Sequence, residues 1–160
     1  MIDVMVRKAT KADAPDLLRL IDALAGYERL APPDAAAKDR LVSDMFRENP
    51  RVEAFLAEAD DMAVGYAIIF ETYSSFLALP TLYLEDLFVL PEYRGKGVGY
   101  RLFKAIVAEA HHRGCGRMEW AVLDWNSIAN DFYNRLGAAR LNEWQYYRLT
   151  GDDFERILKR

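Results

Sequence analysis

The sequence predicts an α/β (α+β) fold in which helices flank a mixed, mostly antiparallel sheet, with residues 1–160 forming one domain. Three strand-like runs follow one another, at 52–59, 62–74 and 81–90. The Asp60-Asp61 pair between the first two runs is typical of a tight antiparallel hairpin turn. Segments with helical periodicity come before and after this block, and 160 residues are enough to bury a substantial core.

The first part of the chain predicts one strand and two helices. The strand covers 4–7. Thr10 followed by Asp13 is typical of a capping box, and the helix that it opens ends at Gly26. A second helix is predicted over 34–47, because an Asn-Pro pair then interrupts the helical pattern.

The last part of the chain predicts two further helices and two further strands. A long helix follows a glycine-rich segment and ends at Gly114, and a strand at 117–123 comes next. A short helix covers 126–137, with Asn126 as its N-cap, and a last strand covers 144–150. The predicted order is therefore β-α-α-β-β-β-α-β-α-β.

Composition and charge argue against several classes of protein. A net charge of -4 and a pI near 5.3 disfavour a nucleic-acid partner, which normally meets a basic surface. No apolar run approaches the ~20 residues of a membrane span, and charges near the N-terminus are unlike a signal peptide. Cys115 is the single cysteine and cannot form an intramolecular disulfide. We therefore expect a cytoplasmic protein without a membrane partner.

The segment "YRGKGVGYRL" at 93–102 carries the strongest functional signal. Its glycine and lysine spacing fits neither a P-loop nor a dinucleotide-binding fingerprint. It does contain R-x-x-G-x-G, formed by Arg94, Gly97 and Gly99, between a predicted strand and a predicted helix. Glycines let backbone N–H groups approach a ligand, and a helix N-terminus attracts anions. The segment predicts a pyrophosphate site, and a glycine-rich connection with solvated cations is the alternative.

The chain resembles the GCN5-related N-acetyltransferase (GNAT) superfamily over about residues 82–139. The resemblance lies in "LEDLFVLPEYRGKGVGYRLF" and "DWNSIANDFYNRLGA". Within that superfamily, "LYLEDLFV", "LAGYERL" and "FYNRLGA" resemble the spermidine/spermine (diamine) acetyltransferase branch and its thialysine-acetylating relatives. The resemblance implies a sheet splayed to admit acetyl-CoA, and it implies a homodimer.

The resemblance also implies how acetyl-CoA is held. The backbone at Leu87, Phe88 and Val89 would pair with the pantetheine arm, and the glycine segment would take the pyrophosphate. The complete set of residues expected to bind acetyl-CoA is Leu87, Phe88, Val89, Arg94, Gly95, Lys96, Gly97, Val98, Gly99, Tyr100, Asn126 and Ala129.

Two groups are candidates for the proton transfers of an acetyl transfer, in which the amine loses a proton and the CoA thiolate gains one. Glu85 and Asp86 interrupt an apolar strand, so either they face opposite sides of the sheet or a bulge re-aims them. Glu85 is expected to take the amine proton through water, and a structural ion pair is the alternative. Tyr133 lies at the edge of the apolar stripe of its helix and is expected to act as general acid, with a packed tyrosine as the alternative.

A small cationic amine is the expected acceptor. Tyr27 and Glu28 offer an aromatic face and a carboxylate to an alkylammonium group. Glu85, Asp86, Glu119 and Trp120 are further candidates to contact this substrate. No metal is expected, because the adjacent histidines at 111 and 112 lack a third ligand at useful spacing.

Nothing in the sequence fixes which amine is used. The candidates are a diamine or polyamine, a lysine-like amino acid, or another small primary amine. Two other classes of function stay open: an acetyltransferase acting on protein lysines or N-termini, and a non-catalytic module that binds acyl-CoA.

Overall fold

The structure of the protein is a computed structural model that describes residues 2–159. The chain divides into two compact units, Met1–Ala121 and Val122–Arg160. The first unit contains a five-stranded sheet, made of β1 (Met5–Lys8), β2 (Glu53–Ala59), β3 (Met62–Ser74), β4 (Leu79–Val89) and β5 (Arg117–Glu119). The expectation that residues 1–160 form one domain stays a prediction.

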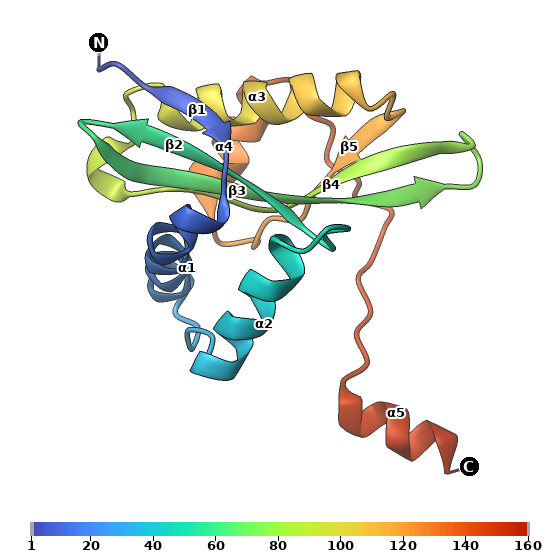
Figure 1. The fold of residues 1–160 in the computed structure, drawn as a ribbon. Coiled ribbons are helices and arrows are strands. Elements are labelled where there is room, and N and C mark those ends of the chain that lie inside the picture. The colour runs from blue at the N-terminus through green and yellow to red at the C-terminus, as the bar shows by residue number, and fades with distance from the viewer. Residues whose placement is uncertain (1, 160) are drawn as a thin grey trace. The chain divides into compact units, whose positions relative to one another are not determined.

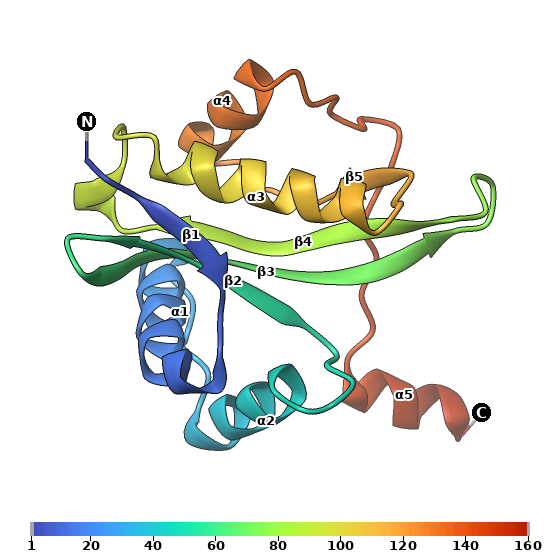
Figure 2. The same ribbon diagram turned by 45° about the horizontal axis from the view of Figure 1, so that its top comes forward.

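The strands lie in the sheet in the same order as in the sequence. Neighbouring strands from β1 to β4 are antiparallel, and β4 and β5 are parallel, so the predicted mixed sheet is confirmed. The longer helices of this unit are α1 (Ala14–Glu28), α2 (Ala35–Met45) and α3 (Val98–His112), and its short 3-10 helices are η1 (Lys11–Asp13) and η2 (Pro91–Tyr93). Helix α3 covers one face of the sheet, and α1 and α2 cover the other (Figure 1 and Figure 2).

A separate apolar core lies on each face of the sheet. The α3 core contains Leu102 and Ile106 of that helix together with inward-facing residues of the strands. The α1/α2 core contains Leu17 and Leu20 of α1 with Met45 of α2. Helices α1 and α3 each bury residues three or four positions apart, which is the spacing that the sequence pattern predicts.

The hairpin between β2 and β3 has the predicted turn. Asp60 and Asp61 both have positive φ angles, 51° and 58°. A two-residue turn with two left-handed residues matches the twist of the strands that it joins, and aspartate tolerates this conformation better than most residues. The hairpin prediction is confirmed.

Gly65 of β3 has no room for a side chain. A Cβ at this position would lie 2.8 Å from the carbonyl oxygen of Phe88 and 3.2 Å from side-chain carbons of Leu102 and Val89. We therefore expect Gly65→Ala to lower the free energy of unfolding by about 1–3 kcal/mol, because the backbone of β4 would have to shift. Urea denaturation followed by circular dichroism measures this change.

Gly26 supplies the matched control. It lies inside α1, and a Cβ there would meet no atom within 4 Å. Gly26→Ala should raise stability by about 0.5–1 kcal/mol, since alanine restricts the unfolded chain and favours a helix. Equal urea midpoints of unfolding for Gly65→Ala and Gly26→Ala would contradict the steric explanation.

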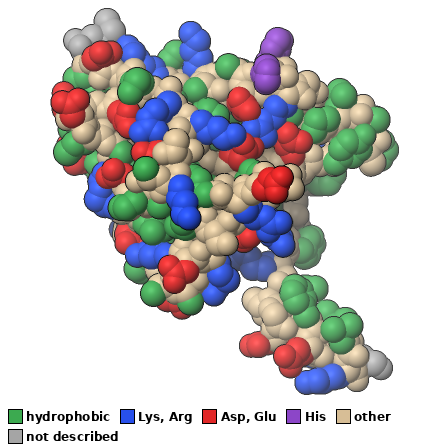
Figure 3. All heavy atoms as spheres, in the orientation of Figure 1, with side chains coloured by type: hydrophobic (Ala, Val, Ile, Leu, Met, Phe, Trp, Pro, Cys, Tyr) green, Lys and Arg blue, Asp and Glu red, His purple; other side chains and the backbone are tan. Residues whose placement is uncertain are grey.

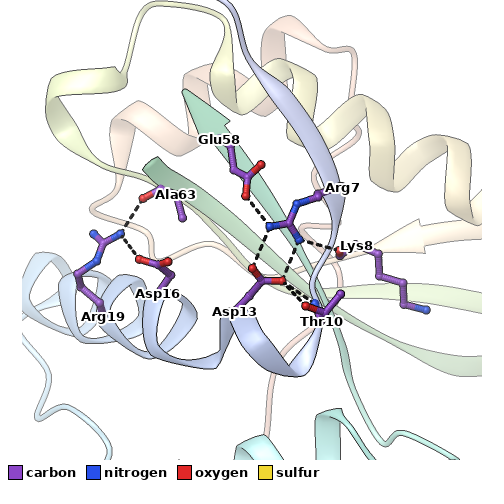
Figure 4. A network of polar contacts seen from close by, with 8 residues as sticks. All are labelled: Arg7, Lys8, Thr10, Asp13, Asp16, Arg19, Glu58 and Ala63. Carbon is purple, nitrogen blue, oxygen red and sulfur yellow. Dashed lines mark hydrogen bonds and ion pairs between the residues drawn. The ribbon is translucent and has the colours of Figure 1, made fainter. Parts of the chain in front are cut away.

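An ion-pair network links η1 to strands β1 and β2 (Figure 4). Arg7 of β1 donates two hydrogen bonds of 2.8 Å to the carboxylate of Asp13, and it pairs with Glu58 of β2 at 2.5 Å. The hydrogen bonds from Arg7 hold the pKa of Asp13 well below its usual range. The capping box predicted from Thr10 and Asp13 is present, and it opens η1 directly before α1.

The outer end of the β3–β4 hairpin is apolar and exposed. Tyr73, Leu77 and Leu79 are exposed there, and Phe76 at the turn is exposed completely. Figure 3 shows these apolar side chains gathered at the end of the hairpin.

The second unit contains two helices, α4 (Ser127–Arg135) and α5 (Gly151–Leu158). The predicted N-cap of α4 is confirmed, since Asn126 Oδ1 accepts a hydrogen bond of 3.2 Å from the N–H of Ala129. Helix α4 ends at Arg135, and Gly137, with a φ of 79°, follows it, whereas the predicted helix continued to 137.

The prediction of a last strand at 144–150 is wrong. This segment has no regular secondary structure, and no described strand pairs with it. Alternating aromatic residues favour a strand, but a strand forms only when its backbone groups meet a partner. Thr150 and Asp153 instead form a capping box that opens α5. The same Thr-x-x-Asp spacing occurs at Thr10, so the start of α5 could have been predicted from the sequence.

Other boundaries differ by a few residues. Helix α1 continues past Gly26 to Glu28 and is closed by Arg29, whose φ is 59°. Strand β5 ends at Glu119, whereas the prediction extended it to 123. None of the helices described between residues 2 and 159 is long and apolar enough to cross a membrane.

Candidate active site

Strand β4 contains a bulge at Glu85. On the neighbouring β3, Ile69 pairs with Leu84 and Ile68 pairs with Asp86, so Glu85 is an extra residue without a partner across the ladder. A bulge of this kind bends a strand and changes where the next side chains point. Of the two arrangements predicted for the adjacent acids, the structure has the bulge.

The bulge moves Asp86 to the α1/α2 face of the sheet. Before the bulge, Leu82 and Leu84 pack in the α3 core, and after it Phe88 packs in the α1/α2 core. Side chains alternate along a strand, so without the extra residue Leu84 and Phe88 would share one face. Asp86, two residues before Phe88, therefore lies on the same face as Phe88.

Asp86 is half-buried and bonded to a tyrosine of the next strand. The hydroxyl of Tyr66 donates a hydrogen bond of 3.1 Å to Asp86 Oδ2. Burial raises the pKa of Asp86 to about 6, the hydrogen bond from Tyr66 lowers it, and the negative charges of Glu85 and Glu28 raise it. Burial also raises the pKa of Glu28, at the end of α1. The structure thus brings three carboxylates of the sequence prediction into one electrostatic group.

Glu28, Glu85 and Asp86, named here the carboxylate group, form no ion pair with the described residues. Within residues 2–159, no lysine, arginine or histidine lies within 4.0 Å of these carboxylates in an ion pair. The alternative that Glu85 and Asp86 form a structural ion pair therefore has no support in the described part of the chain. Negative charge gathered without a counter-ion favours binding of an external cation.

Tyr27 contacts the glycine-rich segment through Arg94. The guanidinium carbon of Arg94 lies 4.4 Å from the centre of the Tyr27 ring and 5.5 Å from that of Phe88. Arg94 Nε also donates a hydrogen bond of 2.8 Å to the carbonyl of Val89. The side chain of Arg94 thus lies against the α1/α2 core, beside the residues predicted to contact the amine.

The outer edge of β4 is open beyond Tyr83. Pairing between β4 and β5 covers three residue pairs and ends at Tyr83 and Glu119. The N–H of Leu90 donates to Val64 on β3, and alternate residues of an antiparallel strand face the same neighbour. Leu87 and Val89 therefore direct their backbone groups away from β3. This open edge of β4 corresponds to the splayed sheet that the family resemblance implies.

The glycine-rich segment turns sharply into α3. Gly95 and Gly97 have φ angles of 70° and 87°, which side chains other than glycine rarely adopt. Gly97 is the N-cap of α3 and provides no side chain to cap it. The first N–H groups of a helix have no partner within that helix, so they can donate to an anion.

The remaining residues of the glycine-rich segment are partly buried and partly exposed. Val98 is buried and packs in the α3 core, and a Cβ at Gly99 would lie 3.8 Å from a side-chain carbon of Val89. Lys96 and Tyr100 are exposed, and the ammonium of Lys96 lies 5.3 Å from the ring centre of Tyr93. Since Lys96 is exposed and the helix start is uncapped, the segment fits the predicted pyrophosphate site.

Two other predicted substrate residues contact other side chains. Glu119 is paired with Arg117 at 2.9 Å. Trp120 packs edge to face on Phe103 of α3, with ring centres 5.5 Å apart. Both side chains of this contact belong to the α3 core, on the opposite face from Asp86.

The second unit carries Tyr133, Asn126 and Ala129. Tyr133 lies on α4, its ring contacts Phe132 edge to face at 5.2 Å, and burial raises its pKa well above the usual value. Its hydroxyl therefore keeps its proton at neutral pH, as a general acid must. The cap between Asn126 and Ala129 fixes the first turn of the same helix.

Sequence reasoning missed Tyr66. It lies among apolar residues of a central strand, where tyrosine is common, and its partner Asp86 is twenty residues away. Only the register of β3 against β4 brings the two together. Among the described residues, no three His, Cys, Asp or Glu side chains are grouped to hold a metal ion.

Comparison with known proteins agrees with these features. Thialysine N-epsilon-acetyltransferase of Bos taurus is 37% identical over 98% of this chain and 98% of that protein. L-ornithine N5-acetyltransferase NATA1 of Arabidopsis thaliana is 32% identical over 96% of this chain and 87% of that protein. Spermidine/spermine N(1)-acetyltransferase-like protein 1 of Homo sapiens is 30% identical over 92% of this chain but only 23% of that longer protein. The predicted branch is confirmed.

The fold also matches solved structures. An integron cassette protein from the mobile metagenome of V. cholerae superposes with a TM-score of 0.82, at 27% identity and with 100% of both chains covered. Residues 17–138 match the sequence profile of the acetyltransferase (GNAT) family. The open edge of β4, the glycine turn into α3 and these relatives lead to one conclusion: the chain belongs to the acetyltransferase (GNAT) family and is an acetyl-CoA-dependent N-acetyltransferase.

Proposed function

We propose that this enzyme acetylates a primary amine of a small cationic substrate, either a lysine-like or ornithine-like amino acid or a diamine or polyamine. The observation that carries the proposal is the carboxylate group Glu28, Glu85 and Asp86, which has no cation of its own in the described chain. Such a group suits an ammonium substrate, because charged hydrogen bonds to carboxylates are strong.

Acetyl-CoA would bind along β4 and the glycine-rich segment. The outward backbone groups of Leu87 and the outward N–H of Val89 suit the amide-containing pantetheine arm, while the Val89 carbonyl accepts a hydrogen bond from Arg94. The N-terminus of α3 suits the pyrophosphate. Lys96, which is exposed, would add positive charge beside it, whereas Arg94 lies over the rings of Tyr27 and Phe88. Asn126 and Ala129 would lie along the far arm, as the family resemblance implies.

Two proton transfers accompany the reaction. The amine nitrogen forms a bond to the thioester carbonyl carbon, and the carbon–sulfur bond breaks to release the CoA thiolate. Glu85 would take the amine proton through water, and Tyr133 would give its hydroxyl proton to the thiolate. Transfer would be direct, and Cys115 would form no acyl-enzyme, since burial raises the pKa of its thiol.

The names of the relatives support the same class of acceptor. Thialysine, L-ornithine and spermidine or spermine each carry a primary amine and at least one further amino group. An acceptor with a second cation would use more than one of the clustered acids. The homodimer and the single-domain organisation stay proposals.

A panel of amines tests the acceptor class. With acetyl-CoA, we expect release of free CoA in the presence of lysine, thialysine, ornithine, 1,3-diaminopropane or spermidine, with kcat/KM at least about tenfold above that for a monoamine without a second amino group, such as benzylamine. Thiol release followed by mass spectrometry of the product measures this. An Asp86→Asn variant should lose most of that preference, because the charge that attracts the second cation is gone.

Other outcomes would replace the proposal. Turnover only on lysine peptides or protein N-termini would assign the enzyme to protein acetylation. Tight acetyl-CoA binding without turnover on any amine would contradict the small-amine proposal altogether. Loss of activity in an exposed control variant on the same sheet, Thr72→Ala, would show that the effect at Asp86 is not specific.

A further inference from the structure

Tyr66 is a fully buried tyrosine whose hydroxyl reaches the carboxylate group. It has an exposed fraction of 0% and lies in the α1/α2 core. Its ring packs against Phe88, with ring centres 6.3 Å apart. The hydroxyl donates to Asp86 Oδ2 at 3.1 Å. A buried hydroxyl without a partner is unfavourable, so this bond fixes both side chains.

The neighbours of Asp86 make this bond important for its charge. The ionisable groups that act on the charge of Asp86 are Tyr66 of β3, Glu85 of β4 and Glu28 of α1. Arg94 also lies on this face, over the rings of Tyr27 and Phe88, but among the described residues it forms no ion pair with Asp86. The two glutamates oppose ionisation of Asp86 when they are charged, and burial opposes it too. Of these three neighbours, Tyr66 alone favours the charged form, because it donates a hydrogen bond to it.

The position of Tyr66 also fixes where the carboxylate points. Tyr66 pairs with Phe88 across the ladder, and Asp86 lies one alternate position along β4, after the bulge. A donor from the centre of the sheet holds one oxygen of Asp86, which leaves the other oxygen for a ligand. The bulge and Tyr66 therefore act together: one selects the face and the other holds the side chain.

We propose that Tyr66 is a positioning and specificity-determining residue that holds Asp86 ionised and oriented to bind the cationic part of the amine. The proposal rests on the proposed function, because it takes Asp86 as a group that contacts the amine. Selection of the amine would then depend on a residue that does not itself contact the substrate. Without the Tyr66 hydroxyl, the site would lose its preference for cations at mildly acidic pH.

The test compares Tyr66→Phe with Tyr73→Phe. Both variants remove only a hydroxyl from β3, but Tyr73 is exposed at the hairpin end. Binding of the preferred amine to the CoA-saturated enzyme is measured by isothermal titration calorimetry between pH 5 and 8, where the amine stays protonated. In the parent, affinity should fall as pH falls through about 6, as Asp86 takes up a proton. Thermal melting checks that both variants fold.

Tyr66→Phe should raise the pH at which amine affinity is half lost by about one unit, since loss of a hydrogen bond to a carboxylate favours its neutral form. This pH is called the binding midpoint below. Affinity at pH 5.5 should fall about eightfold and affinity at pH 8 should barely change, because at pH 8 Asp86 is ionised with or without the bond. Tyr73→Phe should match the parent at every pH.

A titration of the Asp86 carboxyl carbon by ¹³C NMR separates the proposal from the proposed function, because it needs no amine. An upward shift in Tyr66→Phe in both the NMR titration and the binding midpoint supports the proposal. An unchanged NMR titration overturns it, and so does a shifted titration with an unmoved binding midpoint. Failure of every amine to be acetylated would instead overturn the proposed function.

A double-mutant cycle adds an independent check. In an Asp86→Asn background, Tyr66→Phe should have no further effect on amine affinity at any pH, because Tyr66 acts through the carboxylate. Full additivity of the two changes would show that Tyr66 acts on the amine by another route and would overturn the proposal.

Discussion

Tyr133→Phe is expected to lower kcat by about 10²- to 10³-fold, while KM for acetyl-CoA changes by less than about threefold. The reason lies in the pKa of the phenol. Burial raises it well above neutral, so the hydroxyl holds a proton that it can give to the departing thiolate. Phenylalanine keeps the ring and its packing on Phe132 but has no proton to give.

Steady-state kinetics with varied acetyl-CoA measure this effect. Tyr147→Phe is the control, since Tyr147 is exposed in the same unit and bonds only weakly to Gln145 at 3.5 Å. A kcat for Tyr133→Phe within about threefold of the parent would remove Tyr133 as the general acid and would favour the alternative of a packed tyrosine.

Gly97→Val is expected to lower kcat/KM for acetyl-CoA by about 10²-fold. Gly97 has a φ of 87° and forms the N-cap of α3. A β-branched residue strongly disfavours this conformation, so the loop must change shape. A changed loop would no longer direct the first N–H groups of α3 at the proposed pyrophosphate position, and the added side chain would stand in the way of the pyrophosphate.

Gly114→Val is the matched control for this strain. Gly114 follows α3, has a φ of 70°, and a Cβ there would also meet no atom within 4 Å. Both variants should lose a similar ~1–2 kcal/mol of stability, but only Gly97→Val should weaken acetyl-CoA binding in calorimetry. Equal acetyl-CoA affinities in the two variants would contradict the assignment of the loop.

Features that depend on neighbours in sequence could be predicted. The turn at Asp60 and Asp61, the cap at Asn126 and the glycine turn into α3 are set by residues within a few positions of each other. Their backbone conformations follow from local sterics and local hydrogen bonds, so the sequence contains enough information for them.

Features that depend on strand register could not be predicted. The adjacent acids at 85 and 86 allowed two arrangements, and only the pairing of Ile68 and Ile69 with β4 decides for the bulge. The bond from Tyr66 to Asp86 depends on the same register. The wrong strand at 144–150 has a related cause, because its alternating aromatic residues could not reveal whether a partner strand lay beside it.

The short run from Asp86 to Val89 has a consequence for how this enzyme can change. Within these four residues, Asp86 would face the amine on the α1/α2 side of the sheet, and the open edge of β4 would face acetyl-CoA. Consecutive residues of a strand are held about 3.3 Å apart by covalent geometry. The separation between acceptor and donor is therefore built into a single piece of backbone. If the amine binds as proposed, substitutions in α1 and α2 would alter which amine is admitted, and the distance over which the acetyl group travels would stay the same.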